Sequence, residues 1–172
     1  MKKILLFTAL LLGVTFFANA QKVVFLDTEY ILKNIPAYKE AQEQLNKLSA
    51  EWEKEITTKY DELEKLYNQY QVDKLLLSNE MKARRENEIV SKEKEVKTLQ
   101  QKRFGTDGDL FKKEQELIKP IQDEVYNAIK DVSVAESYGL VFDAASSATT
   151  LLYTDSKLDI SDNILKKLGY IK

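Results

Sequence analysis

The sequence predicts an α+β protein in which a long antiparallel α-helical hairpin extends from a small β-rich body. Residues 37–136 contain glycine only at Gly105 and Gly108 and proline only at Pro120. Apolar side chains recur there every three or four positions, which is the period of a helix. One helix of that length would measure about 150 Å at roughly 1.5 Å per residue, so the segment must fold back on itself. Apolar segments rich in β-branched and aromatic residues flank it and predict short strands.

The first 20 residues have the features of a cleavable export signal. Lys2 and Lys3 precede an apolar stretch over residues 4–17, and Ala18-Asn19-Ala20 is a small-x-small cleavage site. The apolar stretch is shorter than the roughly 20 residues of a membrane span, which disfavours a retained anchor. We therefore expect a signal peptide at residues 1–20, cleavage after Ala20 and a mature chain outside the cytoplasm.

Composition argues against an enzyme and against nucleic-acid binding. Without Lys2 and Lys3 the mature chain carries 24 basic and 28 acidic residues, so it does not favour phosphate neutralisation. The chain has no histidine and no cysteine, which excludes a Ser-His-Asp triad, a Cys-His pair, a typical zinc site and disulfides. Its carboxylates are spread along arms predicted to be exposed, without a concave site to hold them. We expect no catalytic residue, no metal and no cofactor.

The outward arm of the hairpin is predicted to begin after Pro36, which is tolerated in the first turn of a helix. The arm is expected to end near residues 74–79, where the apolar period is lost and Ser78-Asn79-Glu80 can cap a second helix. The apolar seam of this arm comprises Leu45, Leu48, Trp52, Ile56, Tyr60, Leu63, Tyr67 and Tyr70.

The return arm, residues 79–103, is roughly half charged and has few apolar positions, so its seam should be thin. Opposite charges four residues apart, such as Glu93 and Lys97, support its helix locally. Phe104–Gly108 is expected to interrupt it as a kink or loop, with a functional hinge as the alternative. The apolar period then resumes, and residues 121–136 are predicted to form an extra helix packed on the body.

The body is assigned to residues 21–36 and 137–172. Three strands are predicted, at residues 22–27, 140–143 and 149–153, with the last two forming a hairpin after a helix exit at Gly139. A short helix is expected after Asp27 or Thr28, and a final helix after Asp159 or Ser161, ending at Gly169. So small a core is marginal alone, and copies are expected to pool their strands. The strand residues expected at that interface are Val24, Phe25, Leu26, Leu140, Val141, Phe142, Leu151 and Leu152.

The order of these segments resembles the Skp/OmpH family of trimeric periplasmic chaperones. The resemblance rests on Val23–Asp27, on Pro36 before charged arms, on Tyr138–Asp143 and on the closing 159–168 helix, and it covers essentially the whole mature chain. It implies a homotrimer with a nine-stranded body. It also implies three hairpins that enclose a cavity for unfolded outer-membrane proteins, without ATP, in the periplasm.

Two groups of residues near the arm ends are candidate contacts for such clients. The first is apolar and comprises Tyr60, Tyr67, Tyr70, Leu75, Leu76, Leu77 and Met81. Its alternative role is packing in the seam, although three consecutive leucines cannot all face one seam. The second is a basic cluster at the turn, Lys74, Lys82, Arg84 and Arg85. It is either a solvated helix end or a contact for acidic client segments or lipid head groups, which leaves a weak membrane-surface contact open.

The sequence thus predicts an ATP-independent periplasmic holdase, a chaperone that binds unfolded outer-membrane proteins and prevents their aggregation. The alternative is a non-catalytic structural or adaptor coiled coil of the cell envelope. The thin, charged seam of the return arm favours the pliable chaperone over a rigid spacer.

Overall fold

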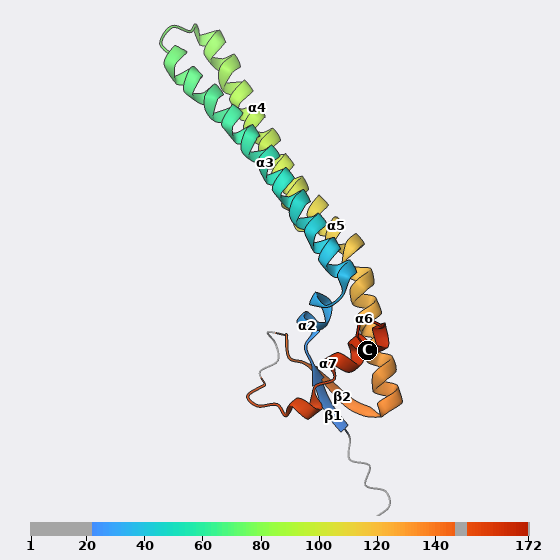
Figure 1. The fold of residues 1–172 in the computed structure, drawn as a ribbon. Helices are drawn as coiled ribbons and strands as arrows, with labels where there is room; N and C mark the ends of the chain where they lie inside the picture. The colour runs from blue at the N-terminus through green and yellow to red at the C-terminus, as the bar shows by residue number, and fades with distance from the viewer. Residues whose placement is uncertain (1–21, 147–150, 172) are drawn as a thin grey trace, which may run out of the picture. The chain divides into compact units, whose positions relative to one another are not determined.

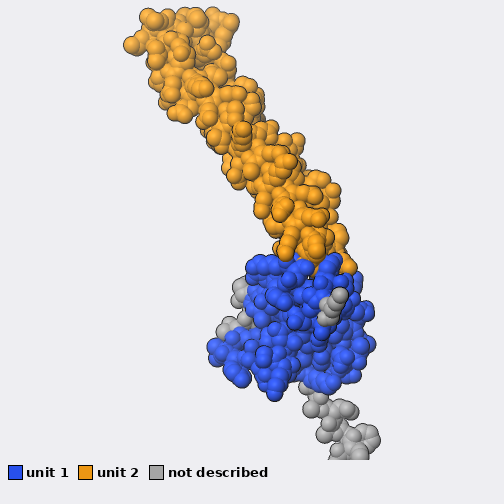
Figure 2. Space-filling model, in the orientation of Figure 1, with its two compact units in different colours: residues 1–34, 125–172 blue, residues 35–124 orange. Residues whose placement is uncertain are grey.

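The computed structural model describes residues 22–146 and 151–171. The chain divides into two compact units, one formed by residues 1–34 and 125–172 and the other by residues 35–124 (Figure 2). The first is called the body unit and the second the arm unit. The predicted signal peptide and its cleavage site after Ala20 lie outside the described residues.

The arm unit contains the predicted helical hairpin. Helix α3 spans Pro36–Asp73, with the proline in its first turn, and α4 spans Asn79–Phe104. The two helices lie side by side and antiparallel (Figure 1). Ser78 caps α4 by accepting a hydrogen bond from the Met81 amide at 3.3 Å, which satisfies an otherwise unpaired helix-end donor. The turn between the two helices lies at residues 74–78.

Helix α4 ends at the predicted interruption, which is a compact turn. Helix α5, Asp109–Leu117, follows directly. A Cβ atom on Gly105 would lie 2.3 Å from the Gln101 carbonyl oxygen, and one on Gly108 would lie 2.9 Å from backbone atoms of Arg103 and Gly105. Both positions therefore require glycine because the backbone passes too close for a side chain. The kink or loop expected from the two glycines is confirmed.

An apolar cluster holds α5 against the first turns of α3. Ala41, Leu45 and Ile118 are buried in it, and four partly buried side chains pack around them: Tyr38, Leu110, Leu117 and Ile121. Helix α6, Lys119–Glu136, begins here, and its residues from Val125 onward belong to the body unit.

The body unit contains a two-stranded parallel sheet. Strand β1, Lys22–Leu26, pairs with β2, Tyr138–Asp143, so that Val24 lies opposite Val141. Phe25 also forms an isolated bridge with Asp159, and its carbonyl accepts a hydrogen bond from the Ile160 amide at 2.9 Å. Strand β1 is therefore paired along both edges.

The third strand, predicted at 149–153, is not found among the described residues. Leu151–Tyr153 is irregular, while Thr149 and Thr150 lie outside the described residues. The predicted hairpin is likewise not found, because the described pairing of β2 is parallel and with β1. A strand needs a neighbour for its backbone groups, and the described part of 149–153 does not pair with the outer edge of β2. Downstream, the short 3₁₀ helix η2 spans Ser156–Leu158.

Capping side chains and two residues with left-handed backbone conformation set the ends of the remaining helices. Asp27 caps α2, Thr28–Lys33, by accepting from the Tyr30 amide at 2.8 Å. Ser137, with φ 56°, makes the exit from α6, so the prediction of Gly139 for that role is wrong; Gly139 lies within β2. Helix α7, Ser161–Leu168, ends at Gly169 with φ 83°, as predicted.

The core of the body unit lies where α2 and α7 meet. These helices contact each other. Four side chains with large volumes are almost fully inaccessible to solvent: Leu26, Ile31, Ile164 and Leu165. Hydrogen bonds connect the N-terminal and C-terminal segments of the body unit around this core. Ser161 Oγ accepts from the Asp27 amide at 2.9 Å, and Thr28 Oγ1 donates to Asp143 at 2.7 Å.

Candidate functional site

The turn between α3 and α4 exposes apolar side chains. Leu75 is 92% exposed and Leu76 is 89% exposed, while Leu77 is half-buried. Met81, in the first turn of α4, is also exposed. The structure thus places these four predicted contact residues together at the end of the hairpin, and the two leucines are directed to solvent.

The three predicted tyrosines separate into different roles. Tyr70 is buried, and its hydroxyl donates a hydrogen bond to Glu86 of α4. That bond raises the pKa of Tyr70 above its ordinary value, with burial as a second cause. Tyr60 is partly exposed and bonds Gln100 Oε1 of α4 at 3.1 Å. These two tyrosines therefore link α3 to α4, whereas Tyr67 is half-exposed and lies outside the seam.

Two members of the predicted basic cluster are paired with acids. Arg84 pairs with Glu80 and Arg85 pairs with Glu88, each at 2.8 Å. Lys74 lies over the ring of Tyr70, 5.5 Å from its centroid, and Lys82 is half-buried. The two arginines of the cluster are therefore engaged within α4.

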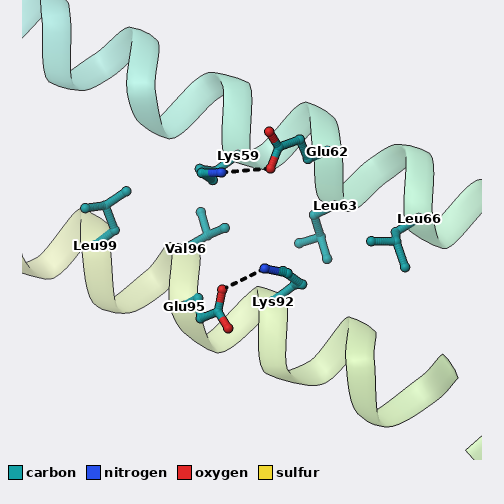
Figure 3. A pocket seen from close by; sticks show the side chains of 8 residues that line it. All are labelled: Lys59, Glu62, Leu63, Leu66, Lys92, Glu95, Val96 and Leu99. Atoms are coloured by element: carbon teal, nitrogen blue, oxygen red, sulfur yellow. Dashed lines mark hydrogen bonds and ion pairs between the residues drawn. The ribbon is translucent and has the colours of Figure 1, made fainter. Parts of the chain in front are cut away.

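A cavity of about 180 Å³ lies between α3 and α4 in the middle of the hairpin. Figure 3 shows four apolar side chains, two from each helix, directed into this space. Val96 is buried and the other three are half-buried. The apolar lining is Leu63, Leu66, Val96 and Leu99; the charged lining is Lys59, Glu62, Lys92 and Glu95.

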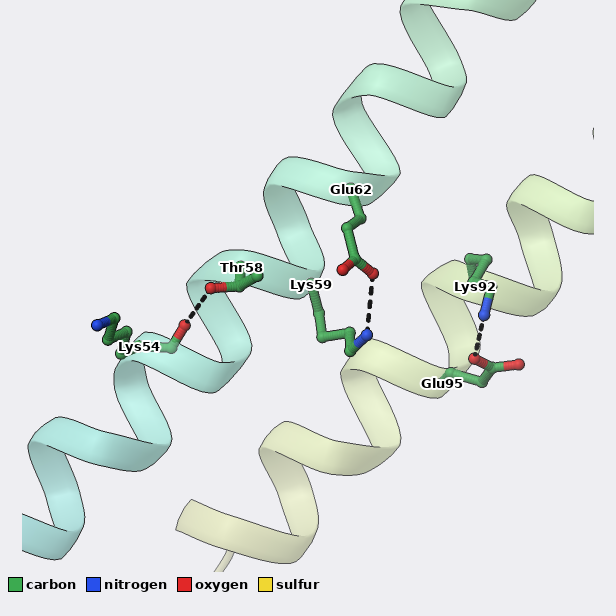
Figure 4. A network of polar contacts seen from close by, with 6 residues as sticks. All are labelled: Lys54, Thr58, Lys59, Glu62, Lys92 and Glu95. Carbon is green, nitrogen blue, oxygen red and sulfur yellow. Dashed lines mark hydrogen bonds and ion pairs between the residues drawn. The ribbon is translucent and has the colours of Figure 1, made fainter.

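Two ion pairs border this cavity, one on each helix (Figure 4). Lys59 bonds Glu62 at 2.9 Å, and Lys92 bonds Glu95 at 3.1 Å. The hydrogen bond raises the pKa of Lys59 and lowers the pKa of Glu62, because it favours the charged form of each. On the same stretch of α3, Thr58 Oγ1 donates to the Lys54 carbonyl at 2.9 Å. Each cation at the rim is thus matched by an acid on its own helix.

Arg103 forms a junction that the sequence analysis did not identify. Its guanidinium pairs with Asp109 at 2.7 Å across the α4–α5 turn and with Glu55 of α3 at 3.2 Å. It also lies over the Trp52 ring at 4.9 Å, and Phe104 meets that ring edge-on. The Asp109 bond raises the Arg103 pKa further. Arg103 therefore joins three helices at the point where the return arm is interrupted. The signal available in the sequence was an arginine directly before the two glycines.

The predicted interface residues of the body divide by strand. Val24 and Leu26 of β1 are buried within the chain, and Phe25 and Val141 are half-buried. The exposed members are Leu140 at 52%, Phe142 at 40%, Leu151 at 38% and Leu152 at 95%. An apolar surface that a further chain could cover thus lies on β2 and on the segment after it.

Neither a metal cluster nor a membrane-spanning helix is found among the described residues. Within residues 22–146 and 151–171, no group of three or more acidic side chains is placed to hold a metal ion. Among the helices of those same residues, none combines the length and apolar character needed to cross a membrane. The features that remain are surfaces: an apolar turn, a bordered cavity and a partly uncovered sheet.

These features define a class of protein that contains a long α-helical hairpin and a small parallel β body. Residues 22–168 match the family described as outer membrane protein (OmpH-like), and the chain belongs to that family. Its fold is similar to the crystal structure of an OmpH-like protein from Caulobacter crescentus CB15, with a TM-score of 0.64 at 16% identity. That match covers 86% of this chain and 83% of the other. No curated protein matches the sequence.

Proposed function

We propose that this protein is an ATP-independent periplasmic holdase that binds unfolded outer-membrane proteins between its helical arms. Membership of the OmpH-like family supports a chaperone-type role. The Caulobacter protein of similar fold carries the description of an outer membrane chaperone. The observation in this chain that carries the proposal is the pair of leucines at the hairpin turn, 92% and 89% exposed.

Exposed leucines suit a binder of unfolded membrane strands. Such strands expose apolar faces and unpaired edges that aggregate in water. Many weak apolar contacts can hold clients of varied sequence, because none depends on one hydrogen-bond pattern. The pairing of Arg84 and Arg85 with acids of α4 supports apolar contact over attraction to acidic client segments.

Self-assembly into a homotrimer is part of the proposal. The apolar side chains left exposed on β2 and after it would be covered by other copies. Sedimentation equilibrium at micromolar concentration should give three times the chain mass. The mass of a single chain would contradict this part of the proposal.

Holdase activity can be tested by diluting a urea-unfolded outer-membrane barrel into buffer with the purified mature protein. We expect light scattering to fall at a molar excess of trimer. The double variant Leu75→Ser, Leu76→Ser should suppress scattering less well, and Val90→Ser, which changes an exposed valine on α4, should act like the wild type. Unchanged scattering with the wild-type protein would overturn the proposal and favour a structural coiled coil.

A further inference from the structure

The cavity in the middle of the hairpin is a preformed space that the two helices do not fill. Protein interiors are packed to high density, and voids larger than a water molecule are few. This cavity measures about 180 Å³, and its floor is formed by Leu63 and Leu66 of α3 with Val96 and Leu99 of α4 (Figure 3). Charged side chains of both helices border this apolar floor, so the site is apolar at its base and polar at its rim.

Cross-helix hydrogen bonds lie on either side of the cavity. Tyr60 bonds Gln100 on the side toward Pro36, and Tyr70 bonds Glu86 on the side toward the turn. Both bonds connect α3 to α4, so the helices that form the cavity are joined to each other at both of its ends.

The rim favours an uncharged occupant with an aromatic ring. Its two ammonium groups are each paired with a carboxylate of the same helix, so the rim carries no net charge (Figure 4). An aromatic ring has a negative face and a positive edge, and it can therefore meet ammonium and carboxylate groups at the same time. A phenol hydroxyl could also donate to Glu62 or Glu95.

The volume of the cavity also fits an aromatic ring. An apolar cavity of roughly 150 Å³ accepts a benzene molecule. The space between α3 and α4 is slightly larger, so it has room for one ring.

We propose that this cavity is a binding subsite for a single aromatic side chain of the unfolded client. The inference rests on the proposed holdase function for the identity of the occupant. Strands of outer-membrane barrels carry girdles of aromatic residues at both membrane interfaces, so an unfolded client presents many such rings. The subsite would add a ring-selective contact to the less selective apolar contacts of the turn.

The ring site itself is tested without any client. We would label the leucine and valine methyl groups of the purified mature protein for NMR and titrate with p-cresol, which represents the tyrosine side chain. Shifts should be confined to Leu63, Leu66, Val96 and Leu99, with a dissociation constant on the order of 1 mM, and Leu45 should stay unchanged. Shifts spread over the hairpin, or none, would overturn the site. Contacts in the free protein between these methyl groups and a ring from another copy would also overturn it.

Variants that fill the cavity test whether it binds a client side chain or is only a packing defect. Leu99→Phe places a ring in the space from α4, Leu66→Phe does so from α3, and Val90→Phe adds the same ring on an exposed position of α4. The two filling variants should lose the p-cresol shifts and hold a barrel client about threefold to tenfold more weakly, while Val90→Phe should match the wild type. Filling variants that lose p-cresol but hold clients normally would overturn the client role. A wild type that binds p-cresol but does not suppress aggregation would overturn the holdase function while leaving the ring site in place.

Discussion

Two regions of the arm unit are held together by different forces. Near Pro36, α3 and α5 share an apolar cluster in which Leu45 is 6% exposed. Farther out, the described contacts between α3 and α4 include tyrosine hydrogen bonds around a cavity lined by half-buried leucines. The first arrangement gains stability from close packing, and the second keeps surface available for contact. One arm unit can thus combine a closely packed region with an adaptable outer part.

The largest expected loss of stability comes from a change in the closely packed region near Pro36. Leu45→Ala should lower the free energy of unfolding by about 2–5 kcal/mol, because it leaves a cavity in a filled cluster. The same change at Leu63, which already borders a void, should cost about 1 kcal/mol. Urea denaturation at one fixed protein concentration would measure both. Equal losses of unfolding free energy would show that the two regions are packed alike.

A smaller loss of stability is expected at the Arg103 junction, which lies between these two regions. Arg103→Met should destabilise the protein by about 1–2 kcal/mol, because it leaves Glu55 and Asp109 without their cation and uncovers Trp52. Arg103→Lys should recover only part of this, since lysine lacks the planar fork.

Arg84→Met is the matched control for the junction. That side chain is 78% exposed beside Glu80, so the loss should stay below about 0.5 kcal/mol. Thermal unfolding in low and high salt would compare the variants. A cost at Arg84 equal to that at Arg103 would mean that the junction contributes no more than a surface pair.

The smallest expected effect tests the Tyr70–Glu86 hydrogen bond between α3 and α4. The folded-state pKa of Tyr70 is raised by its bond to Glu86, so the folded protein holds this proton more tightly than the unfolded chain. The resulting stabilisation is complete below the unfolded pKa near 10 and is lost as pH rises through the folded pKa. Tyr70→Phe should remove this alkaline decline, whereas Tyr67→Phe should retain it. Urea midpoints measured from pH 8 to 11 would decide, and identical profiles for both variants would contradict the link.

Local chemistry made much of the fold predictable. Capping by Asp27 and Ser78 and the helix stop at Gly169 depend on neighbouring residues alone. The sites depend on which residues of the two arms lie opposite each other, and a periodic pattern does not set that register. Leu66, for that reason, faces the seam where Tyr67 was expected, and the Arg103 junction was missed. The predicted third strand is not found among the described residues, because strand propensity in 149–153 does not by itself supply a neighbouring strand.

Parallel pairing of β1 with β2 also orders events during synthesis. The Thr28–Asp143 bond joins positions 115 residues apart, and the whole hairpin lies between them. A chain made from its N-terminus onward exposes β1 long before β2 exists, whereas the hairpin helices can form from local contacts. In the nascent protein β1 therefore stays unpaired while the hairpin helices form, and for that interval the chain resembles an unfolded client of the proposed holdase.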